Sequence, residues 1–299
     1  MMHSIIATNH FNQSLTIELA SPEKSGLAVL SVDGLGPVKA TINMDSAGSQ
    51  DGTKFRNARA TNRNITIQLR YMNDIEESRL KTYKYFPVKE KVKITIVSDD
   101  KTVFTYGWVE SNEPDIFSPE TEGSISIVCE DSYFQSQIAS DTVFYGIHDL
   151  FEFPFSNESL TEPLITISSI ETNLIKPIHY KGDIQTGFEM IMTATGSVSG
   201  VRMYDLETRE IMAIDDAQLI ALTGSGIIKG DQISIQTRKG YRSATLYRDG
   251  SAINILNTLG KGTDWFVLER GDNLFAYTAT DGLVNTEFKI VHRVLYEGI

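Results

Sequence analysis

The chain has 299 residues, long enough for one large or two ordinary domains with a hydrophobic core, so no disulfide or metal is required for folding. It carries 27 lysines and arginines against 39 aspartates and glutamates, and the resulting formal net charge of −12 disfavours a surface built to bind nucleic acid. A single cysteine, Cys129, excludes an intramolecular disulfide and a cysteine-based zinc site, and no apolar run reaches the roughly 18 residues of a membrane-spanning helix.

The first candidate contact surface is a long polar stretch at residues 48–64. It contains no acid after Asp51, and its basic residues are Lys54, Arg56, Arg59 and Arg63. Polar segments between strands usually lie on the protein surface, so we expect a projecting hairpin or loop here. Two interpretations remain open: the basic residues contact acidic neighbours, or the segment is a solvated tip.

One short α-helix is predicted between two strands of the first half. Asn73 is suited to cap it, with Glu76 as the third helical residue, and Pro87 ends it. Five apolar residues fall along one broad stripe at helical spacing: Met72, Ile75, Leu80, Tyr83 and Phe86. We therefore expect about three helical turns that pack on a sheet through this stripe.

The remaining pattern predicts β-strands in both halves of the chain. Apolar and polar residues alternate at residues 65–71, 92–96 and 124–127, and again at 188–194, 232–236, 265–268 and 288–294. Turn-forming pairs such as Asp33-Gly34 and Asp249-Gly250 separate these runs. The predicted fold class is mainly β, with two β-sandwich-like domains and one short helix in the first.

A domain boundary is predicted where the alternation lapses, between residues 131 and 159. Serines and glutamines there mix with a run of aromatic residues, which a flexible linker seldom carries. We assign residues 1–135 to the first domain, 136–155 to a junction and 156–299 to the second domain. A single continuous domain is the alternative.

The sequence shows no pattern that indicates catalysis or metal binding. The five histidines do not stand at metal-ligand spacing, and no Gly-x-Ser-x-Gly nucleophile motif occurs. Cys129 is followed by Glu130 and Asp131, a setting that opposes a reactive thiolate. We therefore expect no enzyme activity, no cofactor and no metal, with acid pairs such as Glu110 and Glu113 leaving a glycosidase as a weak alternative.

The order of several motifs resembles the distal tail protein family of long-tailed phages. In the first half they are residues 32–38, 63–67, the strand 107–111 with Trp108, and the acidic, aromatic corner 130–134. In the second half, residues 180–188, 230–235, 265–275 and 296–299 resemble the galectin-like β-sandwich of that family. Each motif is weak alone, whereas their joint order and spacing are fairly specific.

This resemblance implies a structural protein that forms a ring, usually of six copies, between the tail tube and the tail tip or baseplate. The ring would leave a channel for DNA. The implied partners are further copies of the chain, the tail tube protein, a hub protein of the tail-associated lysin type and a receptor-binding protein. No sequence-specific nucleic-acid binding and no membrane association are expected. The implied location is the tail tip of the virion, after synthesis in the cytoplasm of the bacterial host.

Ring closure requires a head-to-tail interface that repeats from copy to copy, with two different surfaces on each subunit. The candidate interface residues are Lys54, Arg56, Arg59, Arg63 and Trp108, although a lone strand tryptophan fits a core position better. Two other functions remain open. One is a carbohydrate-binding module that uses Trp265 or Tyr241 as a stacking platform, although the chain lacks the galectin sugar-site motifs. The other is a cell-wall hydrolase.

Overall fold

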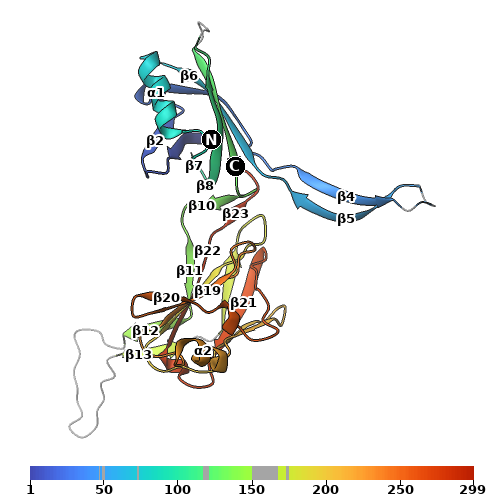
Figure 1. Cartoon of the computed structure of the whole chain (residues 1–299), viewed down its shortest axis with the longest axis vertical. Helices are drawn as coiled ribbons and strands as arrows, with labels where there is room; N and C mark the ends of the chain where they lie inside the picture. Colours follow the sequence, from blue (N-terminus) through green and yellow to red (C-terminus); the bar gives the residue numbers. More distant parts are fainter. Residues whose placement is uncertain (47, 49–50, 73, 117–120, 150–167, 173–174) are drawn as a thin grey trace. The chain divides into compact units, whose positions relative to one another are not determined.

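A computed structural model of the protein describes residues 1–46, 48, 51–72, 74–116, 121–149, 168–172 and 175–299. The chain divides into two compact units. Unit 1 comprises Met1–Ile138 together with Leu295–Ile299, and unit 2 comprises Ala139–Val294. The prediction of a mainly β fold is confirmed, because antiparallel sheets form most of both units (Figure 1).

Unit 1 is built on one nine-stranded sheet. Seven strands follow the order β2-β1-β7-β8-β9-β6-β3, and the short strands β10 and β23 join it beside β8. The strands are β1 (Met2–Thr8), β2 (Ser14–Glu18), β3 (Leu27–Asp33), β6 (Asn64–Tyr71), β7 (Lys91–Ser98), β8 (Thr102–Pro114), β9 (Glu122–Cys129), β10 (Phe134–Ser136) and β23 (Leu295–Tyr296). A short 3-10 helix, η1 (Pro22–Lys24), precedes β3.

The alternation predicted from the sequence sets the two faces of this sheet. Ile65, Ile67 and Leu69 of β6 are fully buried, and Ile125 and Ile127 of β9 lie beside them in the same core. The residues between them face the other side and are mainly hydroxyl, amide or charged side chains. Successive side chains of a strand point to opposite faces, so this pattern fixes the pairing register.

The predicted helix is present, but its cap and its buried face differ from expectation. Helix α1 spans Ile75–Tyr85, and Asp74 caps it by accepting a hydrogen bond from the Glu77 amide, so the cap lies one residue after Asn73, which is outside the described residues. The buried positions are Ser78 and Thr82. The Ser78 hydroxyl donates to the Met72 carbonyl at 3.0 Å, and this close approach needs small side chains.

The predicted apolar stripe of α1 is therefore wrong as a packing face. Ile75, Leu80 and Tyr83 are exposed, whereas Phe86, just after the helix, is buried in the core. Within the helix, Ser78 and Thr82 are buried and Tyr85 packs against the core, whereas Ile75, Leu80 and Tyr83 remain in solvent. Helical periodicity identified the helix but not the face that packs.

Unit 2 is a sandwich of two antiparallel sheets. One has the order β11-β22-β15-β18-β19-β20 and the other the order β14-β21-β16-β17. Their strands are β11 (Ser140–Val143), β14 (Ile175–Tyr180), β15 (Glu189–Ala194), β16 (Arg202–Asp205), β17 (Ile211–Ala213), β18 (Gln232–Gln236), β19 (Ser243–Arg248), β20 (Ser251–Asn254), β21 (Gly271–Thr278) and β22 (Thr286–His292). A separate pair joins β12 (Tyr145–Asp149) to β13 (Ser168–Thr172).

The core of unit 2 is rich in aromatic side chains. Phe144, Phe188, Phe275 and Phe288 are buried in it, and the Tyr277 ring stacks on Phe288 with centroids 4.9 Å apart. Two short 3-10 helices, η2 (Leu256–Thr258) and η3 (Leu283–Asn285), complete the turns. The packing of two sheets face to face agrees with the predicted sandwich.

A second helix in unit 2 was not predicted. Helix α2 spans Asp216–Thr223, is capped by Asp215 and ends at Gly224, which adopts the left-handed conformation with φ of 80°. The sequence at 223–226 has the composition of a turn, and this turn is the end of the helix. Eight residues with only Leu219 buried give too little periodicity to recognise.

The division into units differs from the predicted domain boundaries at both ends of unit 2. The second unit begins at Ala139, within the predicted junction 136–155, and β11 already belongs to its larger sheet. Residues 150–155 of that junction lie outside the described residues. The final residues, Leu295–Ile299, return to unit 1, where β23 pairs with β10. A two-residue strand is too short to be read from alternation.

Candidate interaction site

The polar stretch at 48–64 is part of a hairpin that stands apart from the main sheet of unit 1. Strands β4 (Ala40–Ser46) and β5 (Thr53–Ala60) pair only with each other and extend away from that sheet (Figure 1). Every residue of β4 is exposed, as is every residue of β5 except Ala60. An isolated two-stranded hairpin is marginally stable in water, so this hairpin lacks the covering surface that a stable sheet requires.

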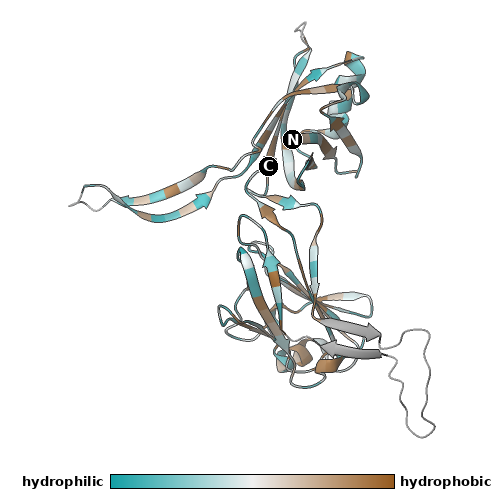
Figure 2. Ribbon diagram, turned by 180° about the vertical axis from the view of Figure 1, so that it is seen from behind, coloured by the Kyte–Doolittle hydropathy of each residue, from teal (hydrophilic) through white to brown (hydrophobic). Residues whose placement is uncertain are grey.

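One face of the hairpin is apolar, and the residues that the structure describes leave it exposed. Cross-strand pairs share a face, and Ile42 lies opposite Ala58 while Met44 lies opposite Phe55. The side chains of Ile42, Met44 and Phe55 are exposed by 59%, 48% and 65%. Apolar and polar segments alternate along both strands (Figure 2). We call Ile42, Met44, Phe55 and Ala58 the apolar ribbon.

A β-bulge produces this apolar ribbon. Asn43 pairs with Asn57, and the next residue, Met44, pairs with Phe55. Arg56 is therefore the extra residue of the bulge, with no partner of its own in the pairing of the two strands. A regular ladder would place Arg56 opposite Met44 and turn Phe55 to the other face. The extra residue therefore keeps a charge out of the apolar ribbon and brings an aromatic ring into it.

The opposite face of the hairpin is polar and carries the predicted basic residues. Thr41 lies opposite Arg59 and Asp45 opposite Lys54, while the side chains of Asn43 and Asn57 are joined by a hydrogen bond of 2.6 Å. Arg56 lies 3.6 Å from Asp45, an exposed pair that contributes little to stability. Lys54, Arg56 and Arg59 thus lie together on one exposed element, as expected.

Arg63 does not belong to this exposed group, which corrects its assignment as an interface residue. The side chain is 1% exposed and lies at the base of the hairpin. It donates hydrogen bonds to the carbonyls of Gly34, Gly36 (2.8 Å), Ser132 (3.0 and 3.1 Å) and Glu297 (2.6 Å). Burial lowers the pKa of the Arg63 guanidinium. These contacts are internal to unit 1, and they join the segments at the base of the hairpin.

Trp108 lies on the surface of unit 1, so the interpretation as core is wrong. Its neighbours Gly107 and Val109 on β8 face the core, and alternation turns Trp108 outward, where it is 45% exposed. The indole Nε1 donates to Glu130 Oε1 at 2.9 Å, and Lys91 Nζ lies 3.0 Å from Glu130 Oε2. Hydrogen bonds from Lys91 and Trp108 lower the pKa of Glu130. Trp108 and the hairpin are separate surfaces of one unit.

The two aromatic side chains proposed as sugar platforms lie beside basic residues in unit 2. The guanidinium carbon of Arg238 is 4.9 Å from the Tyr241 ring centroid, and that of Arg242 is 5.0 Å from the Trp265 ring. Tyr241 is 51% exposed, whereas Trp265 is half-buried against the core. Both rings therefore have a cation over one face, which a flat stacking platform for a neutral sugar does not require.

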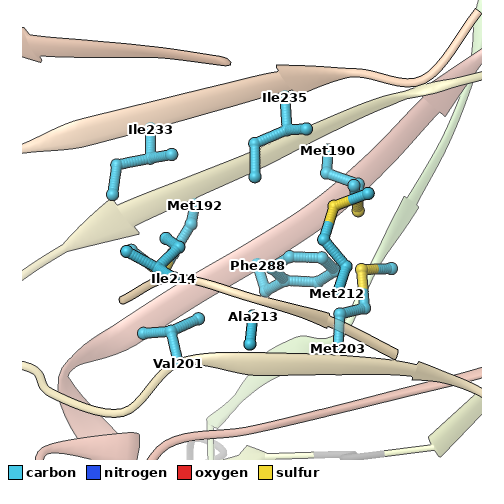
Figure 3. Close-up of a pocket in the computed structure, with 10 residues that line it drawn as sticks. All are labelled: Met190, Met192, Val201, Met203, Met212, Ala213, Ile214, Ile233, Ile235 and Phe288. Atoms are coloured by element: carbon cyan, nitrogen blue, oxygen red, sulfur yellow. The ribbon is translucent and has the colours of Figure 1, made fainter. Parts of the chain in front are cut away.

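The apolar cavity between the two sheets of unit 2 is too small for a sugar or a cofactor. Four methionines surround it, Met190, Met192, Met203 and Met212, together with Phe288 and isoleucines of β18 (Figure 3). Its volume is about 30 Å³ and its lining is almost wholly apolar. Methionine side chains adapt to irregular gaps, so this space is a packing feature of the core.

Within the described ranges, no three histidine, cysteine or acidic side chains are grouped so that they could hold a metal ion. No described helix is long and apolar enough to cross a membrane. Cys129 is buried, and burial raises the pKa of its thiol to about 11. The apolar ribbon was missed by the sequence analysis, although Ile42 and Met44 already alternate with polar residues.

The fold is similar to that of solved phage proteins. The crystal structure of the SPP1 Dit protein, described as a paradigm of the hub adsorption apparatus in phages that infect Gram-positive bacteria, aligns over 97% of this chain and 98% of its own, with a TM-score of 0.63 and 11% identity. Two structures of the phage P2 baseplate in its activated conformation, with Ca and with Sr, align over 98% of both chains at 11% identity and a TM-score of 0.49. No protein-family model and no curated protein matches the sequence. The similarity to SPP1 Dit confirms the resemblance to distal tail proteins at the level of the fold.

Proposed function

We propose that this chain is a structural subunit of a phage tail tip that assembles head to tail into a closed ring, joining the tail tube to the tip or baseplate and leaving a channel for DNA. The observation that carries the proposal is the apolar ribbon. Ile42, Met44 and Phe55 are exposed on a hairpin whose strands pair only with each other among the described residues. An isolated two-stranded hairpin is at best marginally stable in water, and an exposed apolar face is typical of a surface that a partner covers.

A second copy of the chain is the partner that a ring requires. A heterologous interface places one surface of each copy against a different surface of the next, and the interface closes when the rotation does. The hairpin supplies the first surface, with the apolar ribbon on one face and the basic residues Lys54, Arg56 and Arg59 on its polar side. The formal charge of −12 makes other parts of the same chain suitable neighbours for these cations.

The similarity to SPP1 Dit over nearly the whole chain supports a place in a tail hub. Six copies is the ring size that we propose, with the tail tube protein and a lysin-type hub protein as neighbours above and below it, and a receptor-binding protein at the tip. The role is structural and not enzymatic, in the tail tip of the virion after synthesis in the host cytoplasm. The acidic surplus of the chain would let DNA pass without binding.

The experiment compares the wild-type chain with the double variant Ile42→Asp/Phe55→Asp by mass photometry and negative-stain microscopy at the highest soluble concentration. Each buried apolar side chain contributes about 2 kcal/mol, so losing two weakens each contact on the order of a thousandfold. We expect annular particles for the wild type and monomers for the variant.

The matched control is Val284→Asp, which replaces an exposed apolar side chain of unit 2. It should assemble as the wild type does. A wild type that stays monomeric, or rings of normal yield from the Ile42→Asp/Phe55→Asp variant, would contradict assembly through the apolar ribbon. Circular dichroism of the variants shows whether the rest of the fold is retained.

A further inference from the structure

We propose that unit 2 binds an anionic glycan, one that carries phosphate or carboxylate groups, through the basic aromatic loop at residues 237–242 together with Trp265. This binding site is independent of ring formation, because its residues belong to unit 2 and the hairpin belongs to unit 1. The proposed site contains Tyr241 and Trp265, the two residues considered as stacking platforms for a neutral sugar. The ligand proposed here is recognised by its negative charge.

Three basic side chains gather in five residues of this loop. Arg238, Lys239 and Arg242 follow β18, and Lys239, Tyr241 and Arg242 are exposed. In a chain with an excess of acidic residues, such a group forms a local positive surface. Local clusters of one sign attract ligands of the opposite sign even when the net charge of the protein opposes them.

The two arginines lie over the two aromatic rings. Arg238 is 4.9 Å from the Tyr241 centroid and Arg242 is 5.0 Å from the Trp265 centroid. A guanidinium held by a ring loses little conformational freedom when it binds a ligand, and its N–H donors lie in its plane. Phosphate and carboxylate oxygens match this fork of donors.

Hydrogen bonds and a close backbone contact fix the conformation of this loop. The buried Thr237 hydroxyl accepts from the Phe188 amide at 2.9 Å and contacts the Phe188 carbonyl at 3.2 Å, and the Tyr241 amide donates to the Arg238 carbonyl at 2.9 Å. Gly187 lies so close to the Arg238 backbone that a side chain there would have no room. The loop is therefore prepared for binding before the ligand arrives, which reduces the entropy lost on binding.

A neutral sugar is the less suitable ligand for this surface. Stacking of a sugar ring requires a free aromatic face, and here a guanidinium lies over one face of each ring while Trp265 is half-buried on the core. Duplex DNA is also less suitable, because affinity for a duplex grows with the number of phosphates that the protein neutralises, and this loop is a small basic cluster on a chain with an acidic surplus. A flexible anionic glycan can reach a small cluster without approaching the acidic remainder of the chain.

The test measures binding of the full chain to four immobilised probes by biolayer interferometry. The probes are poly(glycerol phosphate), polygalacturonate, a neutral β-glucan and duplex DNA. We expect binding to one or both anionic polymers, with weaker binding as salt rises, and little binding to the neutral glucan and the duplex. The phosphate and uronate arms distinguish the two sources of negative charge.

The variant Lys239→Ala/Arg242→Ala removes two exposed cations, and we expect its affinity for the anionic polymer to fall about tenfold or more. The control Lys181→Ala/Lys229→Ala removes two exposed lysines from other loops of unit 2 and should bind within about twofold of the wild type. Thermal unfolding compares the stability of four proteins: the wild type, the two double variants and the single variant Arg242→Ala.

Three results would overturn the proposal. The first is equal binding by the wild type and the Lys239→Ala/Arg242→Ala variant. The second is no binding of either anionic polymer at low salt. The third is stronger binding of the neutral glucan or of the duplex than of the anionic polymers. Neutral binding that increases in Arg242→Ala, where the Trp265 ring loses its arginine, would instead indicate sugar stacking. The ring experiments use different residues, so failure of either proposal is seen separately.

Discussion

The guanidinium carbon of Arg63 lies 4.1 Å from the centroid of the Phe134 ring. The same guanidinium bonds the segment before β4 at Gly34 and Gly36, the corner after β9 at Ser132, and the segment after β23 at Glu297. The carbonyl dipoles and the face of the ring stabilise its charge in the interior of unit 1. One side chain thus joins three segments at the base of the hairpin.

Replacing Arg63 with methionine should lower the free energy of unfolding by about 3 kcal/mol, because several carbonyls in the interior lose their donor. Urea unfolding followed by circular dichroism measures the change. The control Arg70→Met alters an exposed arginine of β6, the strand that follows Arg63, and should change stability by about 0.5 kcal/mol or less. Equal effects of the two substitutions would contradict a structural role for Arg63.

The polar face of the hairpin gives a prediction about salt. In Lys54→Glu/Arg59→Glu, we expect fewer rings than in the wild type at low ionic strength and a smaller difference at high ionic strength, because salt screens exposed charges. Mass photometry across a sodium chloride series measures the ring fraction. Lys229→Glu in unit 2 is the control. An unchanged ring fraction at low salt would remove these basic residues from the interface.

The sequence predicted the strands because each buries one face, as Ile65, Ile67 and Leu69 do in β6. The sequence did not predict features that depend on a break in the alternation of a strand, or on contacts between residues far apart in the chain. In β5, the bulge at Arg56 puts Phe55 on the face of Ala58, although the two are three residues apart, and no periodicity reveals this. Arg63 is buried because it bonds backbone carbonyls, one of them as far along the chain as Glu297. Every residue has a backbone carbonyl, so the sequence does not indicate which carbonyls Arg63 would bond.

The helix shows a different limit. The buried residues of α1 are Ser78 and Thr82, and Tyr85 packs against the core, whereas Ile75, Leu80 and Tyr83 of the predicted stripe stay exposed. The periodicity therefore identified the helix but not the residues through which it packs. Trp108 is exposed because its strand neighbours Gly107 and Val109 face the core, and successive residues of β8 face opposite sides of the sheet.

Buried His292 in unit 2 should make stability depend on pH. Burial lowers its pKa in the folded state below the usual value of 6.5, so the unfolded chain binds the proton more tightly. Folded stability is therefore full above pH about 6.5 and falls as the pH drops from there through the folded pKa. Urea unfolding between pH 5 and pH 8 should show this fall in the wild type and a smaller one in His292→Gln. Identical slopes would assign the effect to other groups.

Asp231 and Arg248 form an ion pair whose aspartate is buried and whose two hydrogen bonds measure 2.8 and 2.5 Å. Asp231 also accepts from the Ile228 amide at 2.8 Å, and Arg248 donates to Ser225 and Gly226, so the pair holds the turn before β18. Asp231→Ala leaves the arginine without its anion and should lower the free energy of unfolding by about 3 to 5 kcal/mol.

The double variant Asp231→Ala/Arg248→Met tests whether that loss comes from the unpaired charge. It should be more stable than Asp231→Ala alone, because removing both charges avoids a desolvated cation without its partner. The neighbouring Asp249→Asn, at an exposed turn where the positive φ of residue 249 also suits asparagine, should stay within about 0.5 kcal/mol of the wild type. If the double variant is instead less stable than Asp231→Ala, then the bonds of Arg248 to Ser225 and Gly226, more than its charge pairing, hold this turn.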